Sequence, residues 1–368
     1  MPPISQGGGA GSFTAAGTSS GAGSSQASTG GNANAMAGMG GDGSYAAQAG
    51  KSSAAGAAGA PAMPPSGSCD FAHDKLIDVS SAADLARALS SASGGTMIRL
   101  PDGELRGAFR ATVSGSAGKP IVLCGSRAAV LSASATSTVF TLEGDYWVLS
   151  GFSVIGGQKG VLLDGAQHAL LTLLSVHGTG NEGVHFRAGS SDNILEWSEV
   201  SDTGNESPEF GEGVYIGSAL SHWAEFTGSA STPDRSDRNV IRNNKLGPNV
   251  RAELIDVKEG TTGGVIQDNS FDGAGIASGG FADSWVDVKG NGYSLVGNQG
   301  VNAANDGFQV HVVDSGWGND NVFQKNHAEV NAKGYGFRVG DGAKGTVVGC
   351  DNVVSGAGAG LSNIGCKN

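Results

Sequence analysis

The sequence predicts an all-β fold, a right-handed parallel β-helix, that begins with an N-terminal capping helix. Three observations predict it: short strand-like segments recur at intervals of a few tens of residues, a second series of apolar residues and asparagines follows out of phase, and many turns are rich in glycine. Such a repeat indicates a solenoid, because each repeating unit can bury its apolar side only against its neighbours.

The first series consists of segments in which apolar and polar residues alternate, the pattern of a half-buried strand. The segments are Gly160–Leu163, Gly183–Phe186, Gly213–Ile216, Leu254–Val257, Trp285–Val288, Gly307–Val310 and Gly336–Val339. We expect each segment to form one strand of a coil.

The second series places an apolar residue three positions before an asparagine. The pairs are Ile241 and Asn244, Ile266 and Asn269, Leu295 and Asn298, and Phe323 and Asn326. Coils stack at the strand spacing of about 4.8 Å, so inward-facing amides in successive turns can bond to one another. The two series together predict two strands per coil and an asparagine ladder.

The start of the chain predicts a linker followed by a cap. Residues 1–68 are mostly Gly, Ala, Ser and Thr, and ordering them would cost entropy without apolar burial, so we expect a disordered linker. The folded domain is expected over residues 69–368. Ser80 and Ser81 precede an amphipathic run at 82–89, which predicts a helix that covers the open end of the first coil.

The four cysteines give information on the cellular compartment in which the protein works. They lie at the two ends of the folded part and lack the CxxC spacing of a metal site. One interpretation pairs Cys69 with Cys124 and Cys350 with Cys366; the other leaves four reduced, buried thiols. Disulfides predict an extracellular, cell-surface or outer-envelope location, although no signal peptide or transmembrane run is visible in the chain.

The net charge of −12 excludes general binding of nucleic acid, which needs a basic surface to meet phosphates. An anionic ligand must therefore meet a local group of basic residues.

The entry to the coils resembles that of the pectate-lyase-like β-helix superfamily, and most closely that of the alginate lyase and chondroitinase B group. The residues that carry the resemblance are Gly95–Gly103 and Gly118–Leu123, after the predicted helix. The resemblance extends over the whole folded part. It implies the fold, and it implies a protein that acts on an acidic polysaccharide, which we expect to work as a monomer.

In the first series the apolar positions face the interior, so their neighbours face outward on one side of the stack. Read from coil to coil, the outward residues are His185 and Arg187, Tyr215 and Gly217, Asp256 and Lys258, Asp287 and Lys289, Gln309 and His311, and Arg338. This exposed polar column has two interpretations. It can be a structural ladder of opposite charges, which stabilises a sheet, or it can bind an anionic sugar chain.

A local signature adds to the resemblance. The alginate lyase and chondroitinase B group carries E-x-E-x-x-x-x-K, which supplies calcium ligands and the catalytic lysine. Here Glu253 matches the second glutamate, Lys258 matches the lysine, and Arg251 stands at the first glutamate. The resemblance implies calcium as a cofactor, with Glu253 at a ligand position. The oxygen ligands that would suit this ion are Glu212, Glu253, Asp256 and Asp287. Lys289, one coil further on, takes the place of the group's catalytic arginine.

We therefore expect a lyase that cleaves a uronate-containing glycan by β-elimination, with Lys258 as the base and Lys289 as the group that neutralises the developing charge. The residues expected to bind substrate are His185, Arg187, Tyr215, Asp256, Asp287, His311 and Arg338. A noncatalytic carbohydrate-binding or adhesive β-helix is the alternative. A hydrolase that uses Asp256 and Asp287 is disfavoured, since the neighbouring lysines oppose the raised pKa of a general acid.

Overall fold

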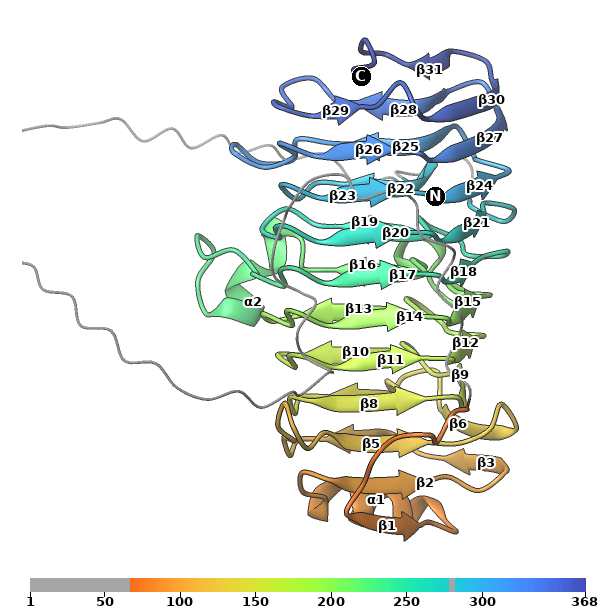
Figure 1. Ribbon diagram of the computed structural model, residues 1–368, viewed down its shortest axis with the longest axis vertical. Helices are drawn as coiled ribbons and strands as arrows, with labels where there is room; N and C mark the ends of the chain where they lie inside the picture. The colour runs from red at the N-terminus through yellow and green to blue at the C-terminus, as the bar shows by residue number, and fades with distance from the viewer. Residues whose placement is uncertain (1–66, 278–281) are drawn as a thin grey trace, which may run out of the picture. The chain divides into compact units, whose positions relative to one another are not determined.

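The computed structural model describes residues 67–277 and 282–368. The predicted linker, apart from its last two residues, therefore lies outside the described residues. In the described part the strands form three parallel sheets that wind as a right-handed parallel β-helix (Figure 1). The chain passes from a strand of sheet A to one of sheet B, then to one of sheet C, and returns to sheet A one coil further on.

Sheet A consists of β1 (Lys75–Asp78), β2 (Thr96–Arg99), β5 (Ile121–Cys124), β8 (Trp147–Ser150), β11 (Leu170–Thr172), β14 (Ile194–Glu196), β17 (Val240–Arg242), β20 (Val265–Gln267), β23 (Ser294–Val296), β26 (Val322–Gln324) and β29 (Val347–Val348). Sheet B consists of β3 (Gly103–Arg106), β6 (Ala129–Ala133), β9 (Ser153–Gly156), β12 (Ser175–His177), β15 (Glu199–Ser201), β18 (Lys245–Leu246), β21 (Ser270–Asp272), β24 (Gln299–Val301), β27 (His327–Ala332) and β30 (Val353–Ala357). Sheet C consists of β4 (Phe109–Ala111), β7 (Phe140–Leu142), β10 (Val161–Asp164), β13 (Val184–Arg187), β16 (Val214–Ile216), β19 (Ile255–Val257), β22 (Ser284–Val288), β25 (Asp306–Val310), β28 (Tyr335–Val339) and β31 (Gly360–Ser362).

The corner between sheets A and B shows that the prediction of two strands per coil is wrong, because there are three. Only two residues separate the strands there, and the first of them has a left-handed backbone. In the six successive coils from β11 to β27 this residue is Leu173, Trp197, Asn243, Asp268, Gly297 and Lys325, with φ values of 57°, 52°, 55°, 52°, 71° and 54°. In all of these coils but one, a single left-handed residue other than glycine turns the chain, so the sequence shows no ordinary turn signal there.

The predicted asparagine ladder is confirmed, and it lies directly after this corner. Asn244 Nδ2 donates to Asn269 Oδ1 at 3.0 Å, and Asn269 Nδ2 donates to Asn298 Oδ1 at 3.0 Å. The ladder continues through Asn326 to Asn352. Each amide oxygen also accepts a bond from the backbone N–H of the preceding asparagine. The ladder thus satisfies polar groups inside the stack that would otherwise be buried without partners.

The predicted cap is also confirmed. Helix α1 (Ala82–Ser91) begins after Ser81, whose hydroxyl accepts a bond from Asp84 N at 3.1 Å. Leu85 and Leu89 are fully buried and join the core of the first coils. The apolar end of the solenoid is therefore covered.

Both predicted disulfides form, Cys69 with Cys124 and Cys350 with Cys366. The first ties the segment before β1 to the outer face of sheet A, and the second ties β29 to the end of the chain. They fasten the two ends of the described domain.

The longest departure from the stack lies between β16 and β17. It includes η2 (Leu220–His222) and α2 (Trp223–Thr227), and α2 projects from the side of the coils (Figure 1). A shorter departure between β15 and β16 contains η1 (Pro208–Phe210). None of the helices in the described residues is long and apolar enough to span a membrane.

Candidate functional site on the outer face of sheet C

The outer face of sheet C carries a row of polar side chains in strict register. The pairing aligns His185, Tyr215, Asp256, Asp287, Gln309 and Arg338. We call this set the central column. Its order is the one that the sequence predicts, because the strands pair without a shift between β13 and β28.

The burial of the central column differs from the prediction of an exposed face. Asp256, Asp287 and Gln309 are only 2%, 3% and 1% exposed, and His185 is 5% exposed. Lys258 and Lys289, which follow β19 and β22, lie against the carboxylates of Asp256 and Asp287. The middle of the column is therefore largely closed to solvent.

A second column flanks the first. It comprises the residues two positions before the first inward apolar residue of each strand: Lys159, Glu182, Glu212, Glu253, Ser284 and Asp306. The backbone confirms the stacking, since Gly183 N donates to Glu212 O and Gly213 N donates to Glu253 O. Sequence reasoning missed Lys159 and Glu182, although the triplet Glu-Gly-Val at 182–184 and again at 212–214 was a usable signal. We call this set the flanking column.

The outward lysines and acids form one continuous series of ion pairs in which positive and negative groups alternate. Asp256 accepts from Lys258 Nζ and from Lys289 Nζ, each at 2.6 Å. Lys289 Nζ also lies 2.7 Å from Asp287 Oδ2. Asp287 in turn lies 2.8 Å from His311 Nδ1. The predicted acid and base pairs are thus brought together over two successive coils.

The pKa values of the buried residues in this series of ion pairs are strongly shifted. Burial acts against the charged form of Lys289, but the carboxylates of Asp256 and Asp287 raise the pKa of Lys289 well above its usual value. Burial likewise acts against ionised Asp287, yet Lys289 and His311 hold the pKa of Asp287 well below its usual range. With its side chain only 10% exposed, Lys289 is a buried cation clamped between two carboxylates.

Tyr215 and Lys258 form the accessible part of the central site. The Tyr215 ring meets His185 edge-on at 4.6 Å between centroids, and Lys258 Nζ lies 4.9 Å from the centre of the Tyr215 ring. Burial and the nearby charge of Asp256 raise the pKa of Tyr215 well above its usual value. The phenol therefore remains protonated near neutral pH and can donate a proton.

Three acids gather at the junction of the two columns. Carboxylate oxygens of Glu212, Glu253 and Asp256 lie within 4.8 Å of one another. Burial, followed by the charge of Asp256, raises the pKa of Glu212 well above its usual value and that of Glu253 to about 7. Glu212 Oε2 is buried without a hydrogen bond in the described part of the chain. In donor type and spacing the cluster fits a hard divalent cation such as calcium.

The remaining predicted residues take separate places. Arg187 makes two bonds to Asp164, at 3.1 and 3.0 Å. Arg338 is 51% exposed and lies 3.8 Å from Asp306. His311, at 37% side-chain exposure, and Arg338 are the cations at the C-terminal end of the central column.

A pocket of about 290 Å³ opens at the other end of the site, beside Tyr215. The central column provides its floor through His185 and Tyr215, and the segment with η2 and α2 provides one wall. The interval from Gly217 to Asp237 is the longest between successive predicted strands, which predicts a loop that rises beside the charged column, and the structure confirms it. The site thus consists of a tyrosine and a lysine, with a pocket on one side and basic residues on the other.

The right-handed parallel β-helix described above is the fold of the pectate-lyase-like superfamily. Similar solved structures include an alginate lyase from Paenibacillus sp. strain FPU-7, with 36% identity and a TM-score of 0.74 over 78% of this chain and 98% of that one. A mannuronic acid-specific family 6 lyase from human gut microbiota is 17% identical, with a TM-score of 0.59 over 78% of this chain and 66% of that one. A pectate lyase, Pel9A, is 15% identical, with a TM-score of 0.53 over 78% and 79% of the two chains.

No protein-family model and no curated protein matches the sequence. The chain belongs to the family of the Paenibacillus alginate lyase, within the pectate-lyase-like superfamily that the sequence predicts. The two more distant lyases support the fold alone.

Proposed function

We propose that this protein is a lyase that cleaves a uronate-containing glycan by β-elimination, and that alginate is the first substrate to test. The observation that carries the proposal is the contact between Tyr215 and Lys258 on the outer face of sheet C. The family relationship to an alginate lyase supports it.

The two side chains divide the proton transfers of the elimination. After its ammonium group has given a proton to solvent, Lys258 takes the proton from the carbon next to the substrate carboxylate, while Asp256 orients the amine through its 2.6 Å contact. The electrons of the broken C–H bond form the new double bond, and those of the C–O bond leave with the glycosidic oxygen. Tyr215, whose raised pKa keeps the phenol protonated until that point, protonates the leaving oxygen.

Lys289 receives a different role from the one that the sequence predicts. Its ammonium group is buried and already neutralised by Asp256 and Asp287, so little of its charge is available to a substrate. We propose that Lys289 is a positioning residue, which keeps Asp256 ionised and aimed at Lys258. The negative charge of the substrate carboxylate must then be neutralised by groups other than Lys289.

Calcium is the cation that we propose for the acidic cluster. Asp256 already accepts from two lysines, whereas Glu212 and Glu253 enter no ion pair among the described residues. Glu212 and Glu253 would hold the ion, and a bound cation supplies positive charge beside the substrate carboxylate. Thermal melts with calcium, magnesium or a chelator test this point. We expect calcium to raise the melting temperature and Glu212→Gln to abolish the rise; no shift in the unaltered protein would refute the calcium site and leave the lyase proposal standing.

We also propose that the protein acts outside the cytoplasm, because both cysteine pairs are oxidised and a polymeric glycan is met there. That it works as a monomer stays a prediction.

The test of the lyase proposal is incubation with alginate, pectate and glycosaminoglycans while the ultraviolet absorbance of the unsaturated product is followed. We expect activity on alginate and a loss of about 10²- to 10⁴-fold in Lys258→Ala and in Tyr215→Phe. Lys245→Ala, which truncates an exposed lysine on sheet B, is the matched control. Full activity of Lys258→Ala would overturn the assignment. Binding of glycan by the unaltered protein without turnover would favour the noncatalytic carbohydrate-binding alternative.

A further inference from the structure

The pocket beside Tyr215 has two aromatic walls that come from separate departures of the chain. Phe210, at the end of η1, is 54% exposed. Phe226, in α2, also lines the pocket. The guanidinium group of Arg187 lies over its ring, 4.4 Å from the ring centre. Aromatic faces of this kind pack against the C–H faces of sugar rings. At about 290 Å³ the pocket is at the small end of ligand sites, which suits one ring better than several.

The lysine and the arginine of the pocket, Lys159 and Arg187, are already neutralised by carboxylates. Lys159 bonds both carboxylate oxygens of Glu182. Burial acts against ionised Glu182, but His185, followed by Lys159, lowers the pKa of Glu182 to about 2. Arg187 bonds both oxygens of Asp164. A sugar carboxylate would therefore find no unpaired lysine or arginine here. The Asn181 amide, which makes no side-chain hydrogen bond within the described chain, is suited to a hydroxyl instead.

The wall that carries Phe226 is fixed before any ligand arrives. Asp234, fully buried near the end of the 217–237 segment, accepts from Ser218 Oγ at 2.6 Å and from the backbone N–H groups of Ala188 and Gly189 at 2.9 and 2.8 Å. Leu220 N donates to the buried carboxylate of Glu259 at 2.6 Å. Both ends of the segment are thereby joined to neighbouring coils.

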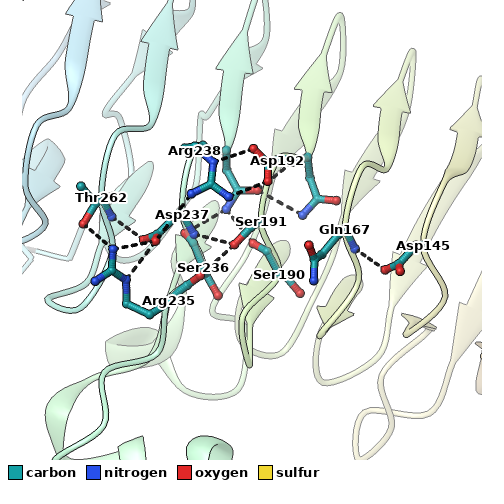
Figure 2. A network of polar contacts seen from close by, with 12 residues as sticks. Asp145, Gln167, Ser190, Ser191, Asp192, Arg235, Ser236, Asp237, Arg238 and Thr262 are labelled. Carbon is teal, nitrogen blue, oxygen red and sulfur yellow. Dashed lines mark hydrogen bonds and ion pairs between the residues drawn. The ribbon is translucent and has the colours of Figure 1, made fainter. Parts of the chain in front are cut away.

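Figure 2 shows a further set of contacts at the base of the same segment. Ser191 Oγ donates to Arg235 O and accepts from Asp237 N, at 2.8 and 2.9 Å. Arg238 makes two bonds to Asp192 of the preceding coil, at 2.7 and 2.6 Å. A wall held in this way loses little conformational freedom when a ligand binds.

The opposite end of the central column differs, because Arg338 is 51% exposed there and makes only a loose contact, at 3.8 Å, with Asp306. Resting on the proposed lyase function, we propose that the pocket is a subsite for one sugar ring of the glycan, recognised by its faces and hydroxyls and not by its carboxylate. The glycan then runs over the outer face of sheet C, where Arg338 at one end contacts its carboxylates and the pocket at the other end binds one ring by its shape. Specificity at the pocket depends on Phe210 and Phe226.

The test uses oligouronates of increasing length with the variants Phe226→Ala and Phe210→Ala. We expect each variant to lose roughly tenfold in kcat/KM on substrates long enough to reach the pocket, and to match the unaltered protein on the shortest substrate that is cleaved. Val353→Ala, which truncates another exposed apolar residue on sheet B, should lose nothing. Because Phe210 is exposed, its variant remains informative if Phe226→Ala fails to fold. An equal loss at every length, or no loss, overturns the proposal.

A binding experiment separates this inference from the lyase proposal. Calorimetry on Lys258→Ala, with and without Phe226→Ala, measures affinity for a long oligouronate and for the same chain with its carboxyl groups reduced. We expect Phe226→Ala to weaken both ligands by the same factor. If the unaltered protein shows no turnover but Phe226→Ala weakens binding, the lyase proposal fails and the subsite stands. If turnover occurs and Phe226→Ala weakens only the charged ligand, or neither, the subsite fails alone.

Discussion

Replacement of Asn269 by leucine removes one member of the buried asparagine ladder while keeping a side chain of similar size. Asn269 is 1% exposed. Its Oδ1 accepts from Asn244 N and Nδ2, each at 3.0 Å, and its Nδ2 donates to Ile241 O at 2.8 Å and to Asn298 Oδ1. In the Asn269→Leu variant the Asn244 N–H and the Ile241 carbonyl lose these partners inside the stack.

The expected cost follows from the two buried backbone groups. A buried donor or acceptor without a partner costs about 1 to 3 kcal/mol, so two cost about 2 to 6 kcal/mol. Burial of the leucine side chain offsets part of this. We therefore expect Asn269→Leu to lower the free energy of unfolding by about 3 kcal/mol. Asn205→Leu is the matched control, because Asn205 is exposed and its amide makes one bond, to Asp202 O; we expect a change within about 0.5 kcal/mol.

Urea unfolding followed by circular dichroism measures both variants against the unaltered protein. Hydrogen exchange supplies the local reading, since the amide of Asn244 should exchange faster in Asn269→Leu while amides several coils away keep their protection. A loss below 1 kcal/mol, or an unchanged exchange rate at Asn244, would show that the ladder does not stabilise the coils in the way argued.

Three further outcomes follow from the series of ion pairs and the chain ends. Lys289→Met should lower the free energy of unfolding by about 3 to 5 kcal/mol in urea, because Asp256 and Asp287 lose the buried cation that they share, although Lys258 and His311 still contact them. Lys289→Arg should retain most of this stability, and equal stability of Lys289→Met and the unaltered protein contradicts the argument. The bond to Asp287 raises the pKa of His311, so its stabilisation is complete below the usual histidine pKa and is lost as the pH rises through the raised value. His311→Gln should therefore destabilise the protein at mildly acidic pH and progressively less at alkaline pH, and the opposite trend across a pH series of unfolding curves argues against the pair. Serine at both Cys350 and Cys366 should cost about 3 kcal/mol, given a sequence separation of 16, and a melting temperature equal to that of the oxidised protein rules this out.

The parts of the fold that repeat could be predicted from the sequence. The inward and outward positions of sheet C follow from strict alternation, so the register of the central column could be predicted from Tyr215 to Arg338. The asparagine ladder could be predicted for a similar reason, because a polar side chain that recurs at one place in each coil needs a partner inside. The third strand could not be predicted, since residues such as Leu173 and Trp197 turn the chain without a turn signature.

The parts of the site that depend on long-range contacts could be predicted less well. Residues 217–237 were expected beside the column, but the pocket that they form depends on contacts such as Leu220 with Glu259 and Ser218 with Asp234. These pairs have no local pattern. Burial of the central column was missed for the same reason, and the role of Lys289 changed with it.

The segment between β16 and β17 leaves the stack and returns without disturbing it. Val214 still pairs with Ile255 on one side of the excursion, and Ile194 still pairs with Val240 on the other. Strand pairing thus does not depend on the segment, which behaves as an insert. Its length and sequence can vary while the strands that hold Tyr215 and Lys258 keep their places. Substrate preference could then diverge in evolution, or be redesigned, by replacing one insert while the proposed reaction chemistry is inherited intact.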